Sequence, residues 1–215
     1  MSKYDAIADK LANEILENSQ KIIGITGTSC IGKSTLTGIL KEKIELSFSV
    51  TVIDVDSYLK EEIRGGKNYW NRCSEYLKPE YYDWQALSLE LKKLSSGISV
   101  EKLVYQRGNG WSGQVVYQPA EYLIVEGLFL DSVQAAEYID YDRMIALTAE
   151  DDYIYNLRIE RDEHYRQNFK GFTRTKEETI KEIESTLKAG KEYTVNKESC
   201  VRTEIFVQED SCTEI

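Results

Sequence analysis

The chain has 215 residues, of which 41% are hydrophobic and 30% are charged, and its formal net charge at pH 7 is −10. This composition is typical of a folded globular protein, and the length fits one α/β domain, residues 1–215, better than two. The acidic balance argues against nucleic acid as a partner, because a nucleic-acid-binding face needs basic side chains to neutralise phosphates.

The cysteines and the apolar segments indicate in which cellular compartment the protein is expected. The four cysteines, Cys30, Cys73, Cys200 and Cys212, lack the paired spacing of a zinc site or of a redox C-x-x-C motif. No signal peptide is recognised, and no apolar stretch reaches the length needed to span a bilayer. We therefore expect a cytoplasmic protein without a membrane partner. The sequence leaves open whether it forms homo-oligomers.

Residues 1–20 are predicted to form a helix at the edge of the core. Ile7, Leu11 and Ile15 recur at intervals of four, and Ala8 and Ala12 lie beside them. This spacing places the five side chains on one helical face, which favours packing against the rest of the domain.

Residues 27–34 form a complete G-x-x-x-x-G-K-[ST] phosphate-binding loop, and the apolar run 21–26 enters it as a strand. Glycines in such a loop let consecutive N–H groups turn toward phosphates, and the following helix adds the positive end of its dipole. Lys33 is predicted to reach the β- and γ-phosphates and Ser34 to ligate Mg²⁺. The predicted ATP-binding residues are Gly27, Thr28, Ser29, Cys30, Ile31, Gly32, Lys33, Ser34 and Thr35.

Between the loop and residue 118 we expect one core strand, one helix and two substrate-side insertions. The β-branched run 49–54 is typical of a buried parallel strand, and the acids Asp54 and Asp56 lie at its end. Residues 60–82 are polar and aromatic without periodicity, which favours a cap over the substrate. A helix over 84–94 follows, and then two strand-like runs, 100–106 and 114–117, predict a hairpin within the second insertion, residues 100–118.

The remaining segments complete an alternating pattern. Strand 122–126 ends on Glu126, a candidate for the Mg²⁺ shell whose alternative is a solvated strand-end acid. Strand 142–147 precedes a lid over about 150–175 that begins with a helix, and helix 176–188 and strand 202–207 follow. We therefore expect an α/β P-loop NTPase fold, with a parallel five-stranded core sheet, helices on both faces and ligands at the carboxyl ends of the strands.

From about residue 21 to residue 207 the order of features resembles the uridine kinase and phosphoribulokinase family of small-molecule kinases. The discriminating element is Asp56-Ser57-Tyr58, which is similar to the D-S-[FY]-Y signature after the family's second strand. The stretches 82–84, 124–128 and 158–166 complete the match. The resemblance implies that Asp56 is the general base for the acceptor hydroxyl and lies near the metal, as phosphoryl transfer requires.

The resemblance also implies a lid whose arginines neutralise the transferring phosphate. Arg161 and Arg166 are the predicted catalytic residues of the lid, and Arg158 is a predicted substrate contact. The alternative for each is a solvated helix face paired with neighbouring acids. The tight Arg-Gly-Arg of the family's lid tip is missing, so Lys170 or Arg174 is another source of positive charge.

On the acceptor side the resemblance implies contacts from Tyr58, Asp83, Tyr105 and Arg107. Tyr105 ends a strand where similar kinases place an aromatic ring against a nucleobase. Asp83 either binds acceptor hydroxyls or caps the helix that begins at Trp84. The histidine that the family has just beyond Tyr105 is missing, so nucleoside specificity is left open.

The predicted activity is transfer of the γ-phosphate of Mg²⁺-bound ATP to a hydroxyl of a small molecule, with a uridine- or cytidine-like nucleoside as the first choice. Nicotinamide riboside, pantothenate, a sugar or a sugar phosphate are alternative acceptors. A regulatory GTPase is disfavoured, because the N-K-E-S run at 196–199 lacks the aspartate of N-K-x-D. A nucleotide-binding sensor without catalysis is the remaining alternative, against which the intact Lys33, Asp56 and Glu126 argue.

Overall fold

The computed structural model describes residues 2–60, 78–106, 110–168, 172–193 and 200–215. Its helices are α1 (Asp5–Glu17), α2 (Lys33–Ile44), α4 (Trp84–Ser95), α5 (Val133–Ala136), α6 (Asp151–Asn168) and α7 (Lys176–Tyr193), with the 3₁₀ helices η1 (Val55–Tyr58) and η4 (Pro79–Tyr81). Its strands are β1 (Ile22–Gly27), β2 (Val50–Asp54), β3 (Val100–Gln106), β4 (Gly110–Tyr117), β5 (Tyr122–Glu126), β6 (Arg143–Thr148), β7 (Val201–Val207) and β8 (Cys212–Glu214). Most of the predicted cap (61–77), Arg107 and Lys170 lie outside the described residues.

The central sheet has the strand order β2-β5-β1-β6-β7-β8. The five strands from β2 to β7 pair in parallel, which confirms the predicted parallel core, and β8 pairs with β7 antiparallel at the edge. Parallel strands buried on both faces need continuous apolar runs, and β1, β5 and β6 have them. The carboxyl end of β1, where the phosphate loop begins, therefore lies in the middle of the sheet.

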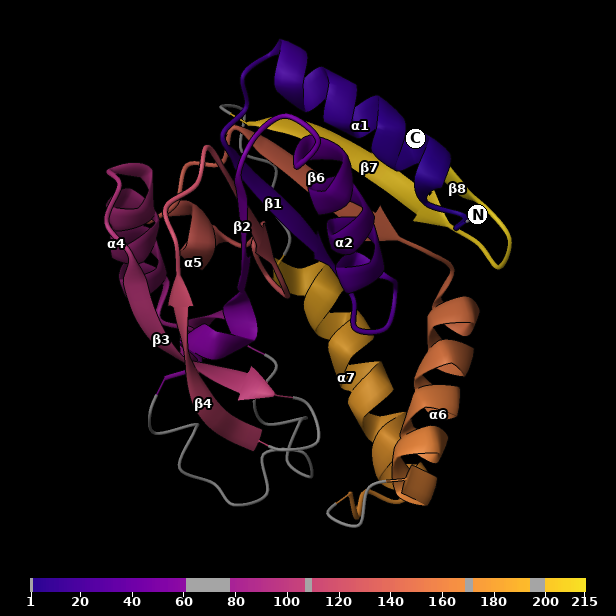
Figure 1. Ribbon diagram of the computed structural model, residues 1–215. Coiled ribbons are helices and arrows are strands. Elements are labelled where there is room, and N and C mark those ends of the chain that lie inside the picture. Colours follow the sequence, from indigo (N-terminus) through magenta and orange to yellow (C-terminus); the bar gives the residue numbers. More distant parts are fainter. Residues whose placement is uncertain (1, 61–77, 107–109, 169–171, 194–199) are drawn as a thin grey trace.

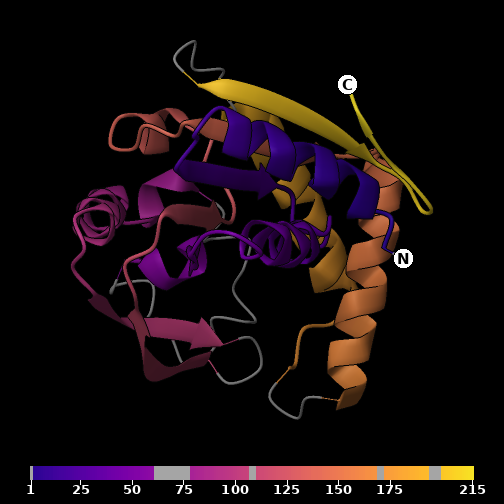
Figure 2. The ribbon, with the colours of Figure 1, turned by 45° about the horizontal axis from the view of Figure 1, so that its top comes forward.

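Helices cover both faces of the sheet, and each face has its own hydrophobic core (Figure 1). On one face α1 and α2 pack over the sheet, with Leu11, Leu36 and Ile25 among the fully buried side chains. Figure 2 shows α1 running beside α2 and the β7–β8 edge. On the other face α4, α5 and η1 pack around Tyr58 and Leu87.

Two further units project beyond the carboxyl edge of the sheet. The helix predicted at the start of the lid is present as α6, and the helix predicted for 176–188 is present as the longer α7. The two helices pack against each other (Figure 1). The predicted hairpin is present as β3 and β4, which form a separate two-stranded sheet. Within the described part of the chain, no helix has both the length and the hydropathy that crossing a membrane requires.

Candidate active site

The phosphate loop connects the end of β1 to the start of α2, and its two glycines have conformations that other residues rarely adopt. Gly27 has φ = 140°, and a Cβ there would lie 2.5 Å from the carbonyl oxygen of Leu147. Gly32, the residue before α2, has φ = 101°. The Lys33 ammonium is buried and donates to the carbonyl oxygens of Gly27 and Thr28, at 2.9 Å each. The lysine therefore lies back across the loop.

The groups around the loop fit a triphosphate and its Mg²⁺. The first N–H groups of α2 have no acceptor within their own helix, and the helix dipole attracts an anion to this end. The Thr28 hydroxyl oxygen is buried and has no hydrogen-bond partner among the described residues. Ser34 is exposed in the first turn of α2. Phosphate oxygens would accept from the amides and could replace the two loop carbonyls as acceptors for the Lys33 ammonium, and the Ser34 hydroxyl is a suitable Mg²⁺ ligand.

Three acids gather where β2 and β5 end beside the loop. Asp54 and Glu126 are neighbours in the parallel register of the two strands. The Asp54 Oδ1 accepts from the Asp56 N–H at 2.9 Å and so caps η1, on which Asp56 is half-buried. The Glu126 Oε2 accepts from the Thr37 hydroxyl of α2 at 3.3 Å. Glu126 thus contacts α2, the helix that follows the phosphate loop, and Asp54 and Asp56 lie at the end of the strand beside its own.

Gly127 permits the close contact between the end of β5 and η1. Its φ is 155°, and a Cβ at this position would lie 1.8 Å from the Cγ1 of Val55. A side chain here would therefore push η1 away from β5. Glycine at this position therefore lets η1, which carries Asp56, pack against the end of β5, which carries Glu126.

Arg161 of α6 contacts the phosphate loop directly. Its Nη1 donates to the Ser29 hydroxyl at 3.0 Å, while its Nε and Nη2 donate to the Asp162 carboxylate at 2.9 and 2.7 Å. The carboxylate fixes the plane of the guanidinium, which suits an arginine that binds phosphate oxygens. The structure therefore brings the predicted lid residue Arg161 to the nucleotide loop.

Behind Arg161, a buried network of charged side chains joins α6 to α7. Arg158 pairs with Glu182 at 2.5 Å. Arg174 binds Asp162 at 3.0 Å and also contacts Glu182. The Thr179 hydroxyl donates to Asp162 at 2.9 Å. These groups satisfy one another's charges between the two helices, so the lid helices are held together by ionic contacts as well as by packing.

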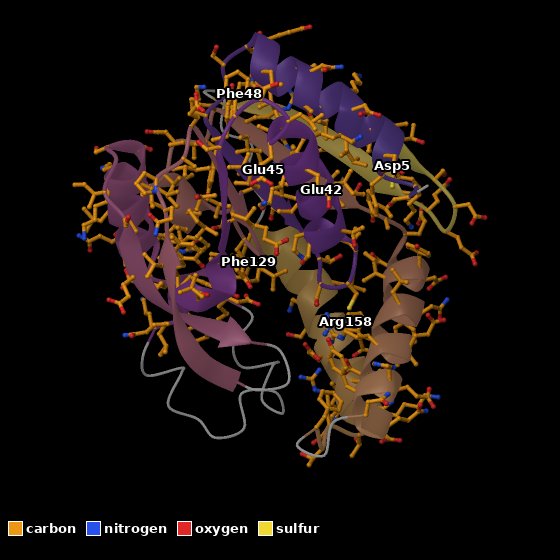
Figure 3. All side chains as sticks on the ribbon, viewed as in Figure 1. Asp5, Glu42, Glu45, Phe48, Phe129 and Arg158 are labelled. Atoms are coloured by element: carbon orange, nitrogen blue, oxygen red, sulfur yellow. The ribbon has the colours of Figure 1, made fainter. Side chains whose placement is uncertain are left out.

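Arg158 and Arg166, the other two arginines predicted to contact phosphate or substrate from the lid, each have partners within the lid. Arg158 lies between α6 and α7 (Figure 3) and is only 1% exposed, so its guanidinium holds the two helices together instead of facing an open site. Arg166 donates to the Arg174 carbonyl and the Thr179 hydroxyl, at 3.3 and 3.4 Å. The solvated face considered for Arg158 is wrong, because its partner Glu182 comes from another helix.

Asp162 is the centre of this network, and its replacement is expected to destabilise the fold in a pH-dependent way. Burial alone would raise its pKa, but the charges of Arg161 and Arg174 outweigh burial and hold the pKa below the ordinary aspartate value. Asp162→Asn is expected to lower the free energy of unfolding by about 3 kcal/mol at neutral pH, because it removes the buried negative charge that pairs with both Arg161 and Arg174. Urea unfolding measures this difference.

The sign of the pH dependence follows from the depressed pKa of Asp162. A carboxyl whose pKa is lower when folded stabilises the protein fully above the unfolded pKa, and this contribution is lost as the pH falls through the folded pKa. The difference between wild type and Asp162→Asn should therefore shrink below about pH 4. Asp152→Asn, at an exposed position of the same helix, is the control. An equal difference at neutral and acidic pH would contradict the charge-based account.

Two of the acceptor-side residues, Tyr58 and Asp83, have clear structural partners. Tyr58 is fully buried, and its hydroxyl donates to Glu90 at 2.6 Å, so it lies in the core in this conformation. Asp83 caps α4, because its Oδ1 accepts from the Ala86 N–H at 2.9 Å, which confirms the capping alternative. Its role toward an acceptor stays a prediction. Tyr105 lies on β3.

A cavity of about 300 Å³ lies beside the phosphate loop, and the sequence pointed to none of its charged residues. Its walls include Thr26 to Thr28, the apolar Phe129 and the ion pair between Asp131 and Arg202, whose N–O distances are 3.2 Å. Burial raises the pKa of Asp131 although Arg202 opposes this effect. The partners are 71 positions apart in the chain, so no local spacing could reveal the pair.

Comparisons with known proteins agree with this architecture. The model of the Phosphoribulokinase / Uridine kinase family matches residues 22–212. A uridine kinase from Ligilactobacillus salivarius is 28% identical over 149 residues, 68% of each chain. A dephospho-CoA kinase from Prochlorococcus marinus is 31% identical over 78 residues. This match spans only 36% of the length of that relative and 36% of this chain.

Solved structures show the same fold at low sequence identity. D-glycerate 3-kinase from Cryptococcus neoformans superposes with a TM-score of 0.65 at 11% identity, covering 97% of this chain and 99% of that chain. An identity this low supports the fold alone. The family model, in contrast, covers the phosphate loop, the acids at the strand ends and the α6–α7 lid, and the chain belongs to the Phosphoribulokinase / Uridine kinase family.

Proposed function

We propose that this kinase transfers the γ-phosphate of Mg²⁺-bound ATP to a hydroxyl of a small molecule, with a uridine- or cytidine-like nucleoside as the leading acceptor. The observation that carries the proposal is the convergence at one edge of the sheet. The phosphate loop, the acids of η1 and β5 and the lid residue Arg161 all reach this edge. A protein that only binds a nucleotide, without transferring phosphate, needs the phosphate loop but not the acids or the arginine.

Each of these groups has a role in phosphoryl transfer. Lys33 would release its two carbonyl partners and bind the β- and γ-phosphates. Asp56 would accept the proton of the acceptor hydroxyl as the new P–O bond forms. Ser34, Glu126 and Asp56, which lies on η1, would hold Mg²⁺. The metal, when bound, would neutralise charge on the phosphate oxygens.

Arg161 would complete the site from the lid side. Its contact with Ser29 places the guanidinium at the loop before any ligand arrives, and Asp162 keeps it oriented. A preorganised cation at the position where charge develops lowers the barrier without a cost for rearrangement during the reaction. Packing of α6 and α7 over the edge would exclude water and so limit hydrolysis of ATP.

The acceptor is the part of the proposal that needs a direct test. According to their names, the relatives above act on chemically different acceptors. Membership of the family therefore does not identify the acceptor of this chain. ADP release should be measured with uridine, cytidine, nicotinamide riboside, pantothenate and a panel of sugars and sugar phosphates. We expect one class to raise turnover far above the ATPase background, and nucleosides are the first choice. If no acceptor does so, the alternative of a nucleotide-binding sensor gains support.

A further inference from the structure

Tyr4 connects the segment before α1 to the middle of the phosphate loop. Its hydroxyl donates to the carbonyl oxygen of Ile31 at 2.6 Å. Tyr4 is 4% exposed and Ile31 is 1% exposed, so the hydrogen bond is shielded from water. A buried carbonyl that loses its donor has no water to replace it. The bond therefore fixes the backbone of the loop at the residue before Gly32.

The second glycine of the loop leaves the space that the Tyr4 ring occupies. A Cβ on Gly32 would lie 1.9 Å from the Tyr4 hydroxyl oxygen and 2.6 Å from the Cζ. The positive φ of Gly32 already favours glycine, and the tyrosine fills the room that glycine provides. The loop and the Tyr4 side chain are thus complementary in shape as well as joined by a hydrogen bond.

The neighbouring Lys3 extends the same segment to the lid. Its ammonium donates to the Tyr153 hydroxyl at 2.8 Å and to the carbonyl oxygen of Gln208. Tyr153 belongs to α6, the helix whose Arg161 contacts the phosphate loop. Residues 3 and 4 therefore touch the loop and the base of the lid helix at the same time.

The helix after this segment anchors it to the core, and the surroundings of Tyr4 keep its hydroxyl protonated. The helix that follows it, α1, buries its apolar stripe against α2 and is also tied to that helix by the ion pair between Asp9 and Lys43, at 2.6 Å. Burial, with smaller contributions from Cys212 and Tyr153, raises the pKa of Tyr4 above its ordinary value. The hydroxyl consequently stays protonated at neutral pH and can act as a donor.

We propose that Tyr4 is a positioning residue for nucleotide binding: its hydroxyl holds the Ile31–Gly32 segment in the conformation that presents the loop amides to the phosphates. The proposal rests on the nucleotide site of the proposed function and does not depend on the acceptor. Tyr4 lies outside residues 22–212, to which the family model matches. The support for the loop therefore comes from a part of this chain beyond the matched region.

Titration calorimetry of the full chain with Mg·ADP tests the proposal without an acceptor. Tyr4→Phe keeps the ring and removes the hydroxyl, with its hydrogen bond to Ile31 and its interaction with Cys212. We expect its dissociation constant for Mg·ADP to rise about five- to tenfold, the range that a lost buried hydrogen bond can produce. Hydrogen exchange should also become faster in the peptide that covers residues 28–36, because the loop samples more conformations.

Thr203→Val is the matched control for loss of stability. It removes a buried hydrogen bond of 2.6 Å that Arg143 donates to the Thr203 hydroxyl. Arg143 begins β6, and the phosphate loop lies at the other end of that strand. We expect it to lower the melting temperature while leaving the Mg·ADP affinity unchanged. Equal affinity of wild type and Tyr4→Phe would overturn the proposal, and so would an equal loss in Thr203→Val. A wild type that does not bind Mg·ADP would instead overturn the nucleotide site on which the proposed function rests.

Discussion

Replacing Asp56 with asparagine is expected to lower the rate of phosphoryl transfer at least ~100-fold, the lower end of what a general base contributes. Asparagine has nearly the same shape, and its backbone N–H can still donate to Asp54 at the start of η1. What it lacks is the ability to accept the proton of the acceptor hydroxyl. The measurement is the steady-state rate of ADP release with the acceptor identified by the screen.

The affinity for nucleotide separates this role from damage to the site. Asp56→Asn should bind Mg·ADP within about threefold of wild type, because the loop still holds the phosphates, Ser34 and Glu126 still hold Mg²⁺, and the amide oxygen of asparagine can also ligate the metal. Asp210→Asn, at an exposed position after β7, removes the same charge from the surface and should keep full activity. Near-normal turnover of Asp56→Asn would show that another group takes the proton.

Replacing Lys33 with methionine is expected to reduce kcat/KM for ATP by ~10²- to 10³-fold, as removal of one preorganised charge-stabilising group does. Methionine fills similar space but carries no charge. In the free protein the Lys33 ammonium is held by two loop carbonyls, so the same substitution also removes two hydrogen bonds from the loop. Initial rates over a range of ATP concentrations measure the effect.

Lys41→Met provides the matched control on the same helix. Lys41 is half-exposed and pairs with Glu45 one turn later, away from the loop. Exposed pairs of this kind contribute little, so the control should behave as wild type. If Lys33→Met kept its kcat/KM, the phosphates would have to be bound elsewhere and the assignment of the loop would be wrong.

The fold was predictable wherever the signal was local and repeated. The five parallel strands each contain an apolar or β-branched run, and a parallel sheet buried on both faces requires such runs. The short β8 escaped prediction because three residues, Cys212–Glu214, carry too little pattern and pair only at the edge of β7. The helix α5 was missed for the same reason, since it has only four residues.

The candidate site was predictable in part. A fixed spacing located the loop between β1 and α2, and the sequence placed Asp54, Asp56 and Glu126 at or just after strand ends, where the structure has them; their roles stay predictions. The role of Arg158 was not visible, because Glu182, which binds it, lies on a different helix. Tyr4 lies 27 positions from its carbonyl partner, and nothing in the local pattern of α1 points to the loop. Contacts of this kind depend on how distant elements pack, so a single sequence does not encode them in any spacing.

The central claim is that phosphate passes from ATP to a small-molecule hydroxyl, and phosphorus NMR of the reaction mixture tests it most directly. With the acceptor from the screen, the account predicts one phosphomonoester of that acceptor for each ADP formed, and neither product above background with Asp56→Asn. Formation of only ADP and inorganic phosphate, at a rate that no acceptor changes, would contradict the account.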